Sequence, residues 1–61
     1  MGYIIIKKKC ENPKFEVVVC CQGQPMVYQY AKLGQALRGY KKLYRENKRY
    51  GTMNFTLQEV L

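Results

Sequence analysis

The chain has 61 residues, with 11 Lys or Arg against 4 Glu and no Asp, which gives a formal net charge of +7. A chain this short forms one domain at most and buries only about 60% of its unfolded surface, so we expect marginal stability. Leu, Ile, Val and Phe make up about a quarter of the residues, which argues against intrinsic disorder. No apolar run approaches the ~18 residues of a membrane-spanning helix.

Side chains that carry catalysis are scarce. The chain has no His, and its four acids are scattered at Glu11, Glu16, Glu46 and Glu59. A His-dependent triad or general base is therefore impossible, and no acidic cluster is available for a divalent metal. We expect a non-enzymatic protein with no cofactor.

The cysteines do not form an evident site. Cys20 and Cys21 are adjacent, so on a strand they point to opposite faces, and Cys10 is distant in sequence. Three Cys without His cannot complete a four-ligand zinc site within one chain. We expect small buried or half-buried side chains in a reducing cytoplasm, with an intermolecular disulfide or a metal shared between subunits as the alternatives.

The N-terminal half predicts strands. Residues 3–9 are rich in β-branched side chains, residues 15–22 are similar, and Asn12-Pro13 between them is typical of a turn. We expect these two segments to pair as an antiparallel hairpin. In residues 26–30, Met26, Tyr28 and Tyr30 alternate with Val27 and Gln29. This segment predicts a third strand, which would complete a three-stranded meander.

The periodicity then changes to that of a helix over residues 31–47. Apolar side chains recur at spacings of four, three and four residues, at Leu33, Leu37, Tyr40 and Tyr44. No Ser, Thr, Asp or Asn caps the start, and Gly34 and Gly39 each cost about 1 kcal/mol relative to Ala. Close packing of the glycines on the sheet would explain their presence.

The C-terminal segment fits two structures. Residues 52–58 alternate as a strand does, whereas Thr56-Leu57-Gln58-Glu59 fits a helix capping box. Too few residues follow Thr56 for a stable helix, so we expect a strand. The predicted fold is α+β, a small antiparallel sheet with one amphipathic helix on one face.

Apolar residues occur on both faces of the predicted hairpin, and a single helix covers only one of them. A second copy of the chain is the simplest cover for the other face, through sheet stacking or edge pairing. We therefore expect a homodimer, with the folding over of the C-terminal tail as the alternative. The residues expected in the core or in the dimer contact are Ile4, Ile5, Ile6, Val17, Val18, Val19, Leu33, Leu37, Tyr40 and Tyr44.

Most of the positive charge falls into two groups. One group occupies a sector roughly 120° wide on the helical wheel, on the side away from the apolar positions. Its members are Arg38, Lys41, Lys42, Arg45, Lys48 and Arg49. The other surrounds the first turn, at Lys7, Lys8, Lys9 and Lys14. A helix face that is only solvated usually mixes charges of both signs, and this one is almost wholly positive.

These groups predict binding to an anionic partner, most simply nucleic-acid phosphate, with Tyr28, Tyr30 or Tyr50 available for base stacking if exposed. The alternatives are a phage- or plasmid-type accessory protein that binds a host protein, and a small anionic nucleotide held between subunits. Solubility alone is a further explanation of the charge. No known nucleic-acid-reading motif is present.

Overall fold

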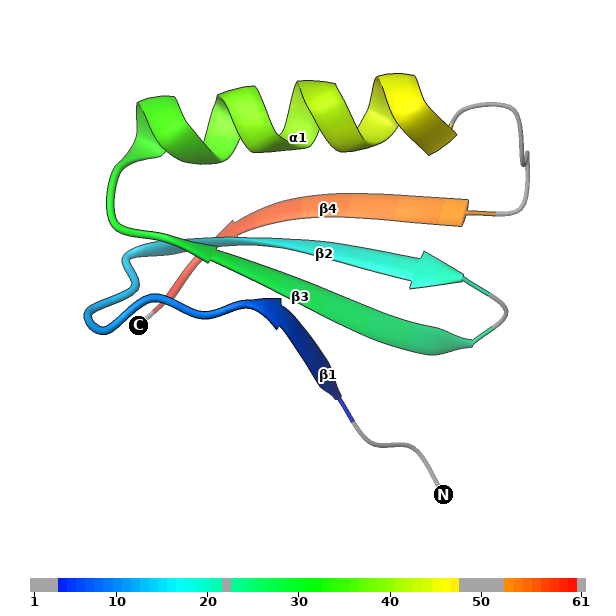
Figure 1. Cartoon of the computed structure of the whole chain (residues 1–61), viewed down its shortest axis with the longest axis horizontal. Helices are drawn as coiled ribbons and strands as arrows, with labels where there is room; N and C mark the ends of the chain where they lie inside the picture. Colours follow the sequence, from blue (N-terminus) through cyan, green and yellow to red (C-terminus); the bar gives the residue numbers. More distant parts are fainter. Residues whose placement is uncertain (1–3, 22, 48–52, 61) are drawn as a thin grey trace.

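The computed structural model of the chain describes residues 4–21, 23–47 and 53–60. These residues form one four-stranded sheet, in the order β1-β3-β2-β4, with a single helix packed on one face (Figure 1). The predicted α+β architecture and the predicted C-terminal strand are confirmed. The elements are β1 (Ile5–Lys8), β2 (Phe15–Cys21), β3 (Gln24–Tyr30), α1 (Leu33–Asn47) and β4 (Met53–Glu59).

The centre of the sheet is a hairpin of β2 and β3. The two strands pair antiparallel over seven residues each, from Phe15 opposite Tyr30 to Cys21 opposite Gln24. Only two residues connect them, and Gly23 has φ of 80°, a conformation that side chains with a Cβ rarely adopt. The third strand therefore begins two residues earlier than predicted and includes Pro25 at its start.

The predicted pairing of the first two strands is wrong. β1 runs antiparallel to β2 in direction, but β3 lies between them and β1 pairs with β3 in parallel. The short link at Gly23 gives β2 and β3 a local pairing, whereas the longer segment after β1 allows the chain to pass the end of β3. That segment is held there by Gln29, whose Oε1 accepts a hydrogen bond of 3.0 Å from the Cys10 backbone N–H.

The outer strand β4 pairs antiparallel with β2 along its whole length, from Phe15 opposite Glu59 to Cys21 opposite Met53. The Val60 N–H continues this ladder with a 2.9 Å hydrogen bond to the Lys14 carbonyl. Because this ladder pairs the backbone N–H and C=O groups that face β2, it stabilises the strand along its whole length. This stabilisation outweighs the local preference of the capping box at Thr56 for a helix.

The core lies between α1 and one face of the sheet. Its buried members are Val17, Val19, Tyr30 and Ala36. The partly buried side chains around them include Tyr40 and Leu43 from the helix and Phe55 and Leu57 from β4. Tyr40 and Tyr44 meet the Phe55 ring edge to face, with centroids 6.3 and 5.5 Å away.

The helix is rotated relative to the predicted packing. Ala36, Tyr40 and Leu43 face the sheet, whereas Leu33, Leu37 and Tyr44 are 47, 42 and 51% exposed. The small residues set this rotation, because at Gly39 the helix backbone lies so close to Tyr30 that an added Cβ would collide with the Tyr30 hydroxyl. We call Leu33, Leu37 and Tyr44 the apolar stripe.

The second face of the sheet, which we call the open face, carries no helix. At its centre lies Val27, only 6% exposed between Val18 of β2 and Ile6 of β1. Ile6 itself is 49% exposed and Ile4 is 66% exposed. The prediction that one helix leaves apolar side chains uncovered is thus confirmed for the described residues.

The two helical glycines give a matched test of this packing. We expect Gly39→Ala to lower the free energy of unfolding by about 1–3 kcal/mol, because overpacking against the buried Tyr30 ring outweighs the gain in helix propensity of about 1 kcal/mol. Gly34 has no atom within 4 Å of an added Cβ, so Gly34→Ala should stabilise the protein slightly. Urea denaturation measures both, and equal effects of the two variants would contradict this account of the helix packing.

Candidate functional site

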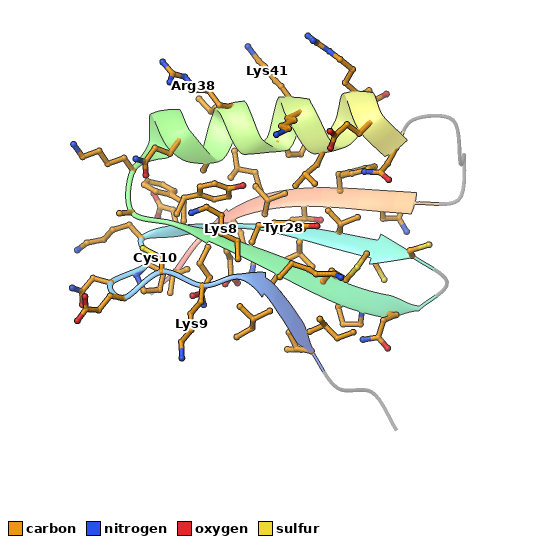
Figure 2. All side chains as sticks on the ribbon, in the orientation of Figure 1. Lys8, Lys9, Cys10, Tyr28, Arg38 and Lys41 are labelled. Carbon is orange, nitrogen blue, oxygen red and sulfur yellow. The ribbon has the colours of Figure 1, made fainter. Side chains whose placement is uncertain are left out.

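Four cations occupy the outer side of α1, and we call them the basic helix face. Arg38, Lys41, Lys42 and Arg45 are all exposed, and together with Glu46 they line a shallow hollow of about 490 Å³. Figure 2 shows Arg38 and Lys41 pointing away from the sheet. None of the four forms an ion pair within the part of the chain that the structure describes. Their positive field is therefore directed to solvent.

The remaining predicted members of this face follow the helix. α1 ends at Asn47, whose side-chain Nδ2 donates a 2.8 Å hydrogen bond to the Leu43 carbonyl. Lys48, Arg49 and the predicted stacking residue Tyr50 lie outside the described residues. The structure thus places four of the six predicted helix cations on one surface.

A groove joins the helix to the β1 side of the sheet. We call it the tyrosine groove, and its volume is about 380 Å³. Its lining residues are Lys8, Tyr28, Tyr30, Gly39, Lys42, Leu43 and Glu46. Lys42 lines both this groove and the hollow on the basic helix face. The structure therefore brings together Lys8 and Lys42, which the sequence placed in separate clusters.

Lys8 is held in a defined position in the tyrosine groove. Its Nζ lies 4.6 Å from the centroid of the Tyr30 ring and donates a 3.3 Å hydrogen bond to the Gln29 carbonyl. A cation over an aromatic face contributes about 0.5–1 kcal/mol at an exposed site. Lys8 thus has a packing role in addition to its charge.

The other cations of the first turn do not join Lys8. Lys7, Lys9 and Lys14 are exposed, and Figure 2 shows Lys9 pointing away from the helix. The register of β1 with β3 is interrupted between Ile6 and Lys8, so Lys8 lies opposite Tyr28 on the helix side of the sheet, although Ile6 lies opposite Val27 on the open face. Of these four lysines, Lys8 lines the tyrosine groove.

The tyrosines differ in their access to a ligand. Tyr30 is only 8% exposed beneath α1, so it does not meet the condition of exposure on which its predicted stacking role depends. Tyr28 is half-buried in the tyrosine groove. Burial, followed by the nearby Tyr28, raises the pKa of the Tyr30 hydroxyl above its ordinary value.

The three cysteines are free thiols, each half-buried. In the strand register Cys20 lies opposite Pro25, and Cys21 lies opposite Gln24, so the two adjacent side chains face opposite sides of the sheet. Among the described residues, no group of three or more His, Cys, Asp or Glu lies close enough to hold a metal ion.

Comparison with known proteins adds no family to these observations. No family model matches the chain, and neither a curated protein nor a solved structure is significantly similar to it. No helix in the described part of the chain has the length and apolar character needed to cross a membrane. The chemistry of the surface is therefore the basis for the functional conclusion.

The raised pKa of Tyr30 predicts a pH dependence of stability. The pKa of this hydroxyl is higher in the folded protein than in the unfolded one, so the unfolded protein loses the proton first as pH rises. The stabilisation is therefore complete below the ordinary tyrosine pKa near pH ~10 and is lost as pH rises through the higher folded-state pKa. We expect Tyr30→Phe to lose less unfolding free energy than the wild type between about pH 8 and about pH 11. Urea denaturation at several pH values measures the unfolding free energy of both proteins. Identical losses would contradict the prediction.

Proposed function

We propose that this protein is a small non-enzymatic module that binds nucleic acid through phosphate contacts, as a homodimer. Lys and Arg on the basic helix face are the primary contacts. The observation that carries this proposal is the set of four exposed cations on one rigid helix face, with Glu46 as the single acid beside them.

The arrangement of charge favours a polyanion. A helix whose charges serve only solubility usually interleaves acids and bases, which pair at i, i+4. Here Arg38, Lys41, Lys42 and Arg45 follow one another along about two turns without ion pairs in the described residues. Phosphates spaced along a nucleic-acid strand supply partners for such a row, and binding releases condensed counterions.

The tyrosine groove supports an extension of this contact beyond the helix. Lys42 and Lys8 lie along it, so a bound strand that leaves the basic helix face meets further positive charge near β1. Tyr28, half-buried in the same groove, offers an aromatic edge to a base or sugar. This contact depends little on base sequence, because the lysines bind the backbone rather than base edges.

The size of the core supports the homodimer. Five hydrophobic side chains are buried among the described residues, Val17, Val19, Val27, Tyr30 and Ala36, and no buried polar side chain accompanies them. Chains of this size commonly need oligomerisation or a comparable aid to be stable. The exposed isoleucines of the open face and the apolar stripe both offer surface for burial.

The salt dependence of binding tests the proposal. We expect the protein to bind fluorescent DNA and RNA oligonucleotides at low salt, with affinity that falls steeply as salt rises. Arg38→Gln and Lys42→Gln should each weaken binding several-fold and reduce the slope of log K against log salt by about 1. Fluorescence anisotropy over a salt series measures both quantities.

Lys32→Gln is the matched control, since it removes the same charge from an exposed residue just before the helix, away from the hollow and the groove. An equal loss in Lys32→Gln would show that net charge alone matters. No binding of DNA or RNA at low salt would overturn the proposal. Stoichiometric capture of one host protein, or a thermal shift with a free nucleotide, would then support the alternatives.

A further inference from the structure

The outer edge of β4 is a free, regular strand edge. The strand pairs with β2 for seven residues without a bulge, and its other side has no strand partner among the described residues. The Val60 N–H points to β2, so by alternation the backbone groups of Asn54, Thr56 and Gln58 do so too. Those of Phe55, Leu57 and Glu59 point outward, away from the sheet.

The opposite edge of the sheet is protected in ways that β4 is not. β1 has only four residues, two of them Lys, and its register with β3 is interrupted between Ile6 and Lys8. Short length, lysines and bulges are the features with which proteins prevent strands from adding to an edge. β4 has seven residues, Met53–Glu59, and contains neither Lys nor Pro.

The apolar stripe borders this same edge. Tyr44 contacts Phe55 of β4 at 5.5 Å between ring centroids, and Leu33 and Leu37 lie on the same side of the helix. Figure 1 shows α1 running alongside β4 in the opposite direction. One side of the molecule therefore offers backbone hydrogen-bonding groups in one layer and exposed apolar side chains in the next.

The charge distribution favours a second copy as the occupant. Two chains of +7 each repel unless they meet where cations are few. The strand β4 carries only Glu59 as a charged residue, and the apolar stripe carries none. Lys41 and Arg45 of the basic helix face border Tyr44 in a shared hollow, whereas Arg38 and Lys42 lie further round the helix. Lys8 lies on β1, at the opposite edge of the sheet.

We propose that two copies pair antiparallel along β4 around a twofold axis, which makes one continuous sheet with both helices on the same face. Each apolar stripe then faces the same stripe of the partner. One isologous contact therefore pairs the outward backbone groups of β4 and buries the exposed apolar side chains. This inference rests on the proposed homodimer and specifies its interface. It also leaves both basic helix faces directed to solvent, on the same side of the dimer.

Amide hydrogen exchange followed by NMR tests the interface without nucleic acid. In the wild-type protein at high concentration, we expect slow exchange for all six amides from Asn54 to Glu59. In a monomer, the outward amides of Phe55, Leu57 and Glu59 should exchange at least ~10-fold faster than the inward ones. Fast outward amides in a protein that is dimeric by light scattering would overturn the proposed interface.

Two variants address the two layers of the contact separately. Leu37→Lys places a charge in the apolar stripe, and Leu37 is 42% exposed and outside the packed core. Glu59→Pro removes one outward N–H and leaves every hydrogen bond to β2 in place. We expect each variant to be monomeric by light scattering at concentrations where the wild type is dimeric, with thermal unfolding still cooperative.

Gln35→Lys is the matched control, because it adds the same charge to an exposed position elsewhere on α1 and should leave the dimer intact. A dimer that survives both Leu37→Lys and Glu59→Pro but dissociates in Ile6→Lys places the contact on the open face. That result overturns this inference and leaves the proposed homodimer standing. A wild-type protein that is monomeric at every concentration overturns both the proposed homodimer and the proposed β4 interface. The oligonucleotide titrations decide nucleic-acid binding independently of these results.

Discussion

The close approach of α1 to the sheet at Gly39 determines how the rest of the surface is arranged. With no side chain at Gly39 and only a methyl group at Ala36, the helix turns this side to Tyr30 and the core valines. The rotation that results leaves the apolar stripe beside β4 and directs the basic helix face to solvent. A larger residue at Gly39 would rotate or lift the helix, and both surfaces would change together.

The sequence was sufficient to predict the kind of each element but not their neighbours. Period-two and helical patterns indicate four strands and one helix, and of the two structures that the C-terminal segment fits, the expected strand is observed. Strand pairing is decided by competition between segments, and the two-residue link at Gly23 placed β3 where β1 was expected. The predicted helix rotation is also wrong, because the small residues Ala36 and Gly39, rather than the large apolar side chains alone, determine which side of the helix packs on the sheet.

The candidate site was partly predictable for the same reason. Spacing along one helix places Arg38, Lys41, Lys42 and Arg45 on one face regardless of tertiary structure. The proximity of Lys8 to Lys42 depends on the parallel pairing of β1 with β3, which no local pattern indicates. Burial of Tyr30 likewise follows from the position of the helix, so its exclusion from base stacking was not visible in the sequence.

The parallel pairing of β1 also constrains the order in which the chain assembles. β1 comes first in the chain, yet its partner β3 ends at Tyr30. During synthesis, three consecutive isoleucines therefore remain without a native partner until the β2–β3 hairpin has been made. Such a segment is prone to associate with other nascent chains, and the run from Lys7 to Lys9 directly after it supplies the flanking charge that opposes this. These lysines thus have the position and charge of residues that flank an aggregation-prone strand.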